Sequence, residues 1–281
     1  MQTDMTVGKP MKMLLNFTIP VFLGNVFQQL YSMADAVIVG KFVGTKGLAA
    51  VGATGTITFL IIGFLMGVTT GVTVLTSQKF GAGRMDEMRK TVGNAAILSA
   101  VIAVVMTAVS MLGMHRLLVF MHTPEDIFDG AYGYIMIICA GIFTQVLYNL
   151  VSSILRALGN SKTPLYFLIL AAGLNIVLDL VFIIFFHWGA PGAAWATVIS
   201  QGVSGVLCLI YMWKAVPELK MKKEDWYFNR DIAVKQISVG IPMGLQYSIT
   251  AIGTMMVQSA LNMLGSYAVA AFTAGSKIEQ I

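Results

Sequence analysis

The sequence predicts an all-α integral membrane protein, a multi-pass bundle of helices, and composition is the first observation behind this prediction. Hydrophobic residues make up 57% of the 281 residues, charged residues only 11%, and the mean hydropathy is +0.79. A soluble domain carries about 25% charged residues. The second observation is the length of the apolar runs, which reach the roughly 20 residues that a helical crossing needs. The third is that these runs lack the short alternating pattern of a membrane barrel, which leaves helices as the spanning structure.

Breakers between the apolar runs divide the chain into seven predicted crossings and the start of an eighth. The eighth begins near residue 267, and the seven complete crossings are expected near residues 14–40, 48–78, 92–114, 130–155, 165–187, 192–213 and 237–264. The first two runs exceed the thickness of one bilayer, so we expect these helices to tilt, kink or extend beyond the membrane.

The basic residues fall mainly on one side of these crossings, which predicts the orientation of the chain. Fourteen of the 18 Lys and Arg residues lie in the N-terminal segment and in the loops on its side, three lie on the other side, and Lys277 lies in the last segment. Loops rich in Lys and Arg remain in the cytoplasm. We therefore expect a protein of the cell membrane that has a cytoplasmic N-terminus and contacts the lipid bilayer.

Other residue patterns exclude several classes of function. The net charge of +5 comes without bases interleaved with aromatic residues, so we expect no nucleic-acid partner. Cys139 and Cys208 lie in apolar runs and form no C-x-x-C pair, and the three histidines lack the spacing of metal ligands. The sequence has no nucleophile–base pair, metal motif or phosphate-binding loop, so we expect neither an enzyme nor a bound cofactor.

Two stretches near the start of the chain recur near its end, which indicates an internal repeat. "TIPVFLGNVFQQLY" from Thr18 resembles "GIPMGLQYSITAIG" from Gly240, and "VGTKGLAAVGATGTI" from Val43 resembles "LGSYAVAAFTAGSKI" from Leu264. The offsets are 222 and 221 residues. Six crossings fit within one period, an even number, so both copies should enter the membrane in the same direction. Many secondary transporters are built from such parallel repeats.

The repeat predicts three regions. Residues 1–213 form an N-terminal lobe of six helices, residues 214–236 a basic cytoplasmic linker, and residues 237–281 the incomplete start of a second lobe. Doubling the period puts the end of a complete second lobe at about residue 440. We therefore expect the chain to be a fragment of a longer protein, and a naturally short protein is the alternative.

Of the 13 acidic residues, only Asp35 and Asp179 lie inside the well-defined crossings. At about 1.5 Å per residue, Asp35 lies about 30 Å along the first crossing, and Asp179 lies roughly 22 Å from Pro164 at the start of the fifth. Both are thus expected in the outer half of the bilayer. Asn175 lies one turn from Asp179 on the same face. Acids inside a crossing are costly and usually functional.

Two further polar residues are expected at the same depth. Thr197 lies about one and a half turns into the sixth crossing, and Tyr134 lies a similar distance into the fourth, both from the outer side. Such a group of oxygen atoms suits a proton or a hard cation such as Na⁺, because burial and a neighbouring carboxylate disfavour the charged acid. Hydrogen bonding between helices is the alternative role for Asp179 and Asn175, and for Tyr134 and Thr197 taken alone interhelical packing is the preferred role.

Glycines and prolines in the crossings predict close packing and bends. Gly63, Gly67 and Gly71 recur every four residues, which lets the second crossing approach a neighbour closely. Pro20 and Pro242 occupy equivalent positions of the repeat. Each removes a backbone hydrogen bond and should kink its helix, and such a kink can serve as a gating joint.

Several short segments occur in a fixed order along nearly the entire chain: "IP" and "ADAVIVG" in the first crossing, "SQKFGAGRMDEMRK" after the second, "RALGNSKTP" after the fourth, "NIVLD" in the fifth and "PGAAWATVISQ" in the sixth. Together they resemble the multidrug and toxic compound extrusion (MATE) transporters, particularly the DinF-like branch. The resemblance implies a fold of twelve helices in two six-helix bundles around a central cavity. It also implies export of cationic or amphipathic organic compounds by antiport with Na⁺ or H⁺.

Position by position, the resemblance carries the N-lobe cation site of the family onto four residues: Asp35, Asn175, Asp179 and Thr197. Tyr134 matches an adjoining polar position less closely, and Pro20 matches a proline whose bending is associated with switching. The NorM-like branch uses a carboxylate in helix 7, where this sequence offers only Gln246, Ser248 and Thr250.

These observations predict a monomeric secondary transporter in which a cation or proton at Asp35 and Asp179 shifts the first helix and alters the affinity for substrate. Two alternatives remain open. A lipid-linked oligosaccharide flippase of the same superfamily should carry more cationic residues in its spans than this chain does. A non-transporting membrane fragment, a scaffold or a channel subunit would show no saturable, gradient-dependent flux.

Overall fold

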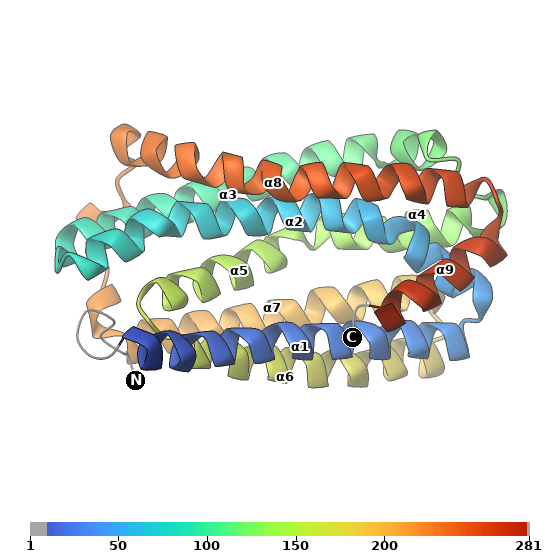
Figure 1. Ribbon diagram of the computed structural model, residues 1–281, viewed down its shortest axis with the longest axis horizontal. Coiled ribbons are helices and arrows are strands. Elements are labelled where there is room, and N and C mark those ends of the chain that lie inside the picture. The colour runs from blue at the N-terminus through green and yellow to red at the C-terminus, as the bar shows by residue number, and fades with distance from the viewer. Residues whose placement is uncertain (1–9, 280–281) are drawn as a thin grey trace.

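The computed structural model describes residues 10–279, and this part of the chain is a bundle of long helices joined by short loops (Figure 1). The predicted regions 1–213 and 237–281 each include a few residues outside this range. The helices are α1 (Pro10–Phe42), α2 (Thr45–Gly81), α3 (Met85–Phe120), α4 (Glu125–Ala140), α5 (Ile142–Ala157), α6 (Lys162–Leu180), α7 (Gly189–Ala215), α8 (Arg230–Asn262) and α9 (Ser266–Glu279).

The apolar composition of the helices agrees with a multi-pass membrane protein. Within the described residues, five helices are long and apolar enough to cross a membrane, or six if α4 and α5 form one bent span. They correspond to the first six predicted crossings. The seventh predicted crossing is the helix α8, which has 33 residues but does not reach the same hydropathy.

The predicted fourth crossing, residues 130–155, is a bent pair of helices rather than one continuous helix. It consists of α4 and α5, which meet at Gly141 at an angle of 47°. A Cβ atom at Gly141 would lie 2.3 Å from Cγ2 of Val198 on α7. The bend therefore occurs where the backbone passes directly against α7, a contact that the local sequence does not reveal.

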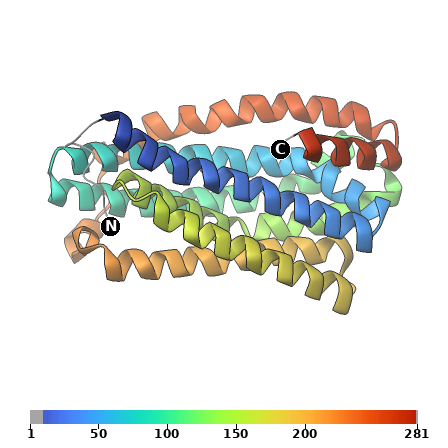
Figure 2. The same ribbon diagram turned by 60° about the horizontal axis from the view of Figure 1, so that its bottom comes forward.

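The helix ends fall into two groups, at the two ends of the bundle (Figures 1 and 2). We call the end with the α2–α3, α5–α6 and α7–α8 connections the basic end, and the other the opposite end. Each half has its own apolar core. Ile57, Leu118 and Ile135 belong to the core near the opposite end, and Met88 and Leu155 belong to the core near the basic end.

Helices α2 and α8 pack backbone against backbone, and this is the close neighbour that the glycines of α2 predict. A Cβ atom at Gly67 would lie 2.5 Å from the carbonyl oxygen of Met243, and one at Gly71 would lie 2.4 Å from Cα of Gly240. On the other side of the contact, a Cβ atom at Gly244 would lie 2.8 Å from Phe64. Only glycine permits this separation of the two helices.

The repeat has a structural counterpart in two turns at the opposite end. Gly44 precedes α2 and Gly265 precedes α9, and both have φ = 91°, a left-handed conformation that favours glycine. Both helices that contain the paired prolines, α1 with Pro20 and α8 with Pro242, continue without interruption through them.

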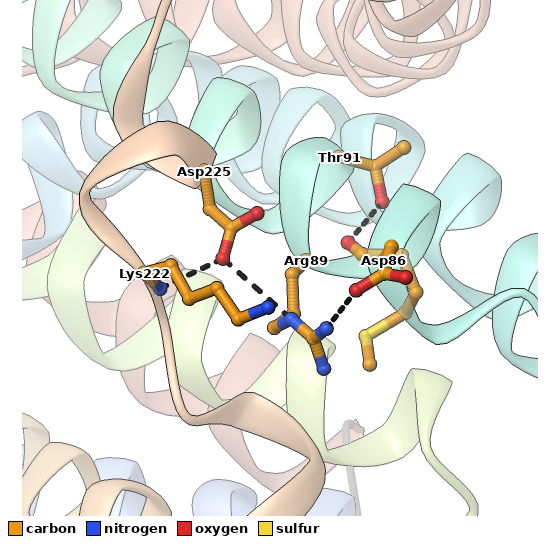
Figure 3. Close-up of polar contacts among 6 residues, drawn as sticks. Asp86, Arg89, Thr91, Lys222 and Asp225 are labelled. Carbon is orange, nitrogen blue, oxygen red and sulfur yellow. Dashed lines mark hydrogen bonds and ion pairs between the residues drawn. The ribbon is translucent and has the colours of Figure 1, made fainter.

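The segment between α7 and α8 folds against the start of α3 (Figure 3). Asp225, which is buried, accepts a hydrogen bond from the backbone N–H of Lys222 at 2.8 Å and lies 3.6 Å from Nε of Arg89. Arg89 also pairs with Asp86. The backbone of this segment lies so close to α3 that a Cβ atom at Gly93 would be 2.0 Å from the carbonyl oxygen of Asp225.

A second set of hydrogen bonds fixes the start of α8. The side chain of Asn229 accepts from the first backbone N–H groups of α8, and the backbone N–H of Asn229 donates to Oδ1 of Asn94 at 3.1 Å. One turn into the helix, the buried Gln236 donates to the carbonyl oxygens of Val72 and Thr91 at 3.0 and 2.8 Å.

Candidate cation-binding site

Asp35 of α1 and Asp179 of α6 meet in the half of the bundle next to the opposite end. Helices α1 and α6 pack against each other, and the two carboxyl groups are close enough to share a hydrogen bond. Asp179 has no exposed surface, whereas Asp35 is half-buried with its Oδ1 atom enclosed. Two carboxylates this close cannot both be charged without a compensating positive ion or proton.

Three buried oxygen atoms around this pair receive no hydrogen bond from the described part of the protein. They are Oδ1 of Asp35, Oδ1 of Asp179 and Oε1 of Gln201. Most buried acceptors in folded proteins have a donor, and an unpaired one requires an explanation. Lone pairs on carboxylate and amide oxygens are the groups that bind a proton or a hard cation.

Asn175 and Thr197 fix the other side of Asp179. The amide of Asn175 lies 3.4 Å from Oγ1 of Thr197. With the amide turned over, it donates to Oδ2 of Asp179 at 3.3 Å and accepts from the backbone N–H of Thr197 at 3.3 Å, so both of its ends are paired. In that orientation Asn175 holds one oxygen of Asp179 and leaves the other free.

Tyr134 of α4 lies beside the acid pair rather than in direct contact with it. Its ring is buried, and its hydroxyl interacts electrostatically with both Asp35 and Asp179. The hydrogen bonds of the described residues include none between Tyr134 and either acid. The five predicted site residues are therefore near one another, and Tyr134 interacts with the two acids only electrostatically.

Sequence reasoning missed two neutral residues of the site, Tyr31 and Gln201. The phenol of Tyr31 lies near the side chains of Gln201 and Gln28 and near both acids. Tyr31 precedes Asp35 by four residues, and Gln201 follows Thr197 by four. Helical spacing alone puts each of them on the same face as a predicted residue, one turn nearer the basic end.

Lys277 is the third missed residue, and it comes from the last helix. Its Nζ atom donates a hydrogen bond to Oγ of Ser32 at 2.7 Å, and its charge is attracted to that of Asp35. The sequence signal is a single lysine within a predicted membrane segment, but its direction depends on how α9 packs.

A polar cavity adjoins the site on the side of the basic end, between α1, α2, α5, α6 and α7. It begins near Pro20 and reaches Gln201, so it shares a wall with the acid site. Its polar lining consists mainly of the amides of Asn25, Gln28, Gln145, Asn149 and Gln201, and it also includes the guanidinium group of Arg156. Ile62, Met66 and Leu168 supply apolar surface.

The ligand set fits a monovalent ion or a proton better than a divalent metal. In residues 10–279, no three His, Cys, Asp or Glu side chains form a cluster that could hold a metal ion. The site instead offers two carboxyl groups, amide oxygens and hydroxyls, which are hard oxygen ligands.

The chain is similar to transport proteins along nearly its full length. The MatE family model matches residues 20–181. "Probable multidrug resistance protein YpnP" of Bacillus subtilis is 32% identical over 280 residues, covering 99% of this chain and 62% of that protein. A "FAD transporter" of Shewanella oneidensis is 25% identical, covering 96% of this chain and 60% of that protein.

The chain is also similar to solved structures of MATE family transporters. One described as the outward-facing conformation of a multidrug resistance MATE family transporter of the MOP superfamily has a TM-score of 0.85 at 28% identity. The match covers 97% of this chain and 60% of that one. The present chain thus spans about 60% of the length of the proteins it matches, which are named as transporters or resistance proteins rather than enzymes.

Proposed function

The chain belongs to the MatE family, and we propose that its protein is a secondary transporter that exports small cationic or amphipathic organic compounds by antiport with Na⁺ or H⁺. The observation that carries the proposal is the pair of acids from two different helices, Asp35 and Asp179, each with a buried oxygen that accepts no hydrogen bond from residues 10–279. A structural pair of this kind would be expected to have donors.

The acid pair supplies a simple coupling step. When both carboxylates lose their proton or cation, their mutual repulsion disfavours the close contact between α1 and α6, and uptake of one positive ion restores it. The two occupancies therefore favour different positions of α1. Antiport follows if the organic substrate prefers the arrangement that the ion disfavours.

Pro20 is a position at which α1 can bend when the acid pair gains or loses an ion. It lies in the same helix as Asp35, toward the basic end, where its ring removes one backbone hydrogen bond. Bending therefore costs less there than elsewhere in α1. Pro20 also lines the polar cavity, so a bend at this residue would change the cavity as well as the acid site.

The amide-lined cavity is our candidate for the substrate path in this part of the protein. Amides with neighbouring apolar side chains accommodate organic molecules of varied shape and donate or accept hydrogen bonds as required. Because Gln201 contributes to both the cavity and the acid site, substrate and ion would be sensed by the same side chain.

We further propose the topology that the charge pattern predicts. The basic end faces the cytoplasm of a cell whose plasma membrane contains the protein, and the acid site lies toward the outside. Residues 1–213 form one lobe, residues 214–236 a linker, and residues 237–281 begin a second lobe. The working unit is a monomer without a nucleic-acid partner.

The test is efflux of a fluorescent organic cation from proteoliposomes that contain the complete natural protein, driven by an imposed Na⁺ or proton gradient. We expect Asp35→Asn and Asp179→Asn to reduce the gradient-dependent flux about 100-fold. Asp126→Asn is the matched control, since Asp126 is an acid near the opposite end that is more than a third exposed and pairs with Lys46 at 3.6 Å.

Two results would contradict the proposal. Gradient-driven efflux that survives in both variants would remove the acid pair from the mechanism. Transfer of a lipid-linked oligosaccharide across the membrane, without efflux of any organic cation, would identify the flippase alternative.

A further inference from the structure

We propose that Lys277 is a tethered counter-ion of the Asp35–Asp179 pair, and that the coupling cation must displace its ammonium group in order to bind. The inference rests on the proposed function and adds a residue from α9 to the machinery. It makes the ion compete with a positive charge that belongs to the protein itself.

The position of the ammonium group is fixed by a hydrogen bond. Nζ of Lys277 donates to Oγ of Ser32 at 2.7 Å, and Ser32 lies three residues before Asp35, on the same face of α1. Helices α1 and α9 contact each other, and α9 runs from the opposite end of the bundle back toward the middle of α1 (Figure 1). The lysine therefore reaches the acid site from outside the six predicted N-lobe helices.

Within residues 10–279, the other groups that face the acid pair carry no positive charge. Tyr31 comes from α1, Tyr134 from α4, and three uncharged polar side chains complete the surroundings: Asn175, Thr197 and Gln201. Lys277 is the cation that the described structure brings into electrostatic contact with Asp35. Buried charges are expected to be compensated, and Lys277 provides that compensation without supplying a hydrogen bond to Oδ1.

Displacement of Lys277 would connect ion binding to the contact between α1 and α9. A bound cation neutralises the charge of the acids. The ammonium group is then no longer attracted to them and is free to leave Ser32. Since α9 follows α8 in the region predicted to begin the second lobe, this exchange loosens a link between the two predicted lobes. Ion affinity and the strength of that link are therefore reciprocal.

The test measures the concentration of coupling cation that gives half-maximal efflux, in the complete natural protein in proteoliposomes. Sodium chloride is titrated at constant pH, and pH is titrated without Na⁺. We expect Lys277→Gln to lower the half-saturating cation concentration about tenfold, because the competing charge is gone. Lys41→Gln is the matched control: Lys41 is an exposed lysine beside the Phe42 ring, and its loss changes the net charge equally.

Two more variants separate charge from structure. Lys277→Arg keeps the positive charge and should remain within about threefold of the original half-saturation. Ser32→Ala removes the hydrogen bond and keeps the charge, so its effect should lie between those of the two lysine variants. Equal half-saturation in Lys277→Gln and Lys41→Gln would overturn the inference.

A labelling experiment covers the case in which Lys277→Gln fails to fold. Acetic anhydride modifies lysine amines, and mass spectrometry compares the modification rate of Lys277 with that of Lys41. We expect Asp35→Asn to raise this ratio at constant pH, because the neutral amide no longer holds the ammonium group in place. An unchanged ratio would mean that Lys277 is held by packing alone.

The failures of the two proposals are distinguishable. If Asp35→Asn and Asp179→Asn both still transport, the proposed function fails. If Asp179→Asn is inactive while Lys277→Gln has ordinary half-saturation and the labelling ratio does not change, only the role of Lys277 fails.

Discussion

Two aspartates of this protein are buried to nearly the same degree, yet their surroundings differ in kind. Asp225, 4% exposed, lies at the basic end beside a guanidinium group and a backbone N–H donor. Asp179, 0% exposed, lies near the opposite end beside a second acid, and its Oδ1 atom has no donor among the residues that the structure describes. The charge of Asp225 is compensated by its neighbours, whereas that of Asp179 is left for an exchangeable ion or a more distant lysine.

The difference teaches how to separate structural from functional buried acids. A carboxylate with an adjacent cation and a hydrogen-bond donor is satisfied in one conformation, so it stabilises that conformation. A carboxylate pair without close donors has two or more occupancies of similar free energy. That property is unfavourable for stability and useful for coupling.

The largest expected effect compares the two aspartates directly. Asp179→Asn should reduce gradient-driven efflux about 100-fold, at the upper end of typical coupling free energies, and leave the thermal unfolding temperature unchanged or higher. Asp225→Asn should leave efflux nearly unchanged and lower the unfolding free energy by about 1–2 kcal/mol. Efflux assays and thermal unfolding in detergent measure the two effects. The comparison fails if both variants lose transport equally.

The second prediction removes the compensating cation at the basic end. Arg89→Ala leaves Asp225 buried without its guanidinium neighbour, so we expect a loss of about 3 kcal/mol in the unfolding free energy. Arg89→Lys should recover part of it. Thermal unfolding of the two variants decides the question, and a stability loss no larger than that of a surface substitution would show that the ion pair is unimportant.

The third prediction concerns the close approach of the linker to α3. Gly93→Ala places a methyl group 2.0 Å from the carbonyl oxygen of Asp225, so the linker must shift, at a cost of about 1–3 kcal/mol. Gly113→Ala on the same helix is the control, because nothing lies within 4 Å of its Cβ position. It should be stabilising by about 1 kcal/mol. Both are measured by thermal unfolding, and equal effects would argue against the tight contact.

The smallest expected effect is a pH dependence at the surface of the basic end. The hydrogen bond from Lys79 lowers the pKa of Glu87 below its ordinary value of 4.5. The stabilisation of the folded state by the Glu87 carboxylate is therefore present above about pH 4.5 and is lost as the pH falls through the folded-state pKa. Glu87→Gln should lower the unfolding temperature slightly at pH 7 and not at pH 3. A difference that persists at pH 3 would point to packing instead.

Much of the fold could be predicted because each helix carries its own apolar run and its own breakers. The order of the helices and the close approach at Gly67 and Gly71 follow from such local patterns, whereas the family assignment came from the resemblance of several short segments to known transporters. The break at Gly141 does not, because it depends on Val198 of another helix. No periodicity within residues 130–155 reports that contact.

The acid site likewise contains residues that could be predicted from the sequence and residues that could not. Depth along two crossings predicted that Asp35 and Asp179 would lie at one level, and their carboxyl groups are close together in the structure. Tyr31 and Gln201 could have been found from helical spacing. Lys277 could not, since its position depends on the path of α9 across α1. The role of these residues in ion coupling stays a prediction.

The glycine contact between α2 and α8 has a mechanical consequence. Where the two backbones approach at Gly67–Gly244 and Gly71–Gly240, the neighbouring side chains of Phe64 and Val68 pack tightly against the glycines and have little room to change rotamer. A sideways displacement of α8 should therefore displace α2 as well, so that the two helices move as one rigid unit. Relative movement in the transport cycle should then concentrate where flexible side chains separate the helices, as between α1 and α9.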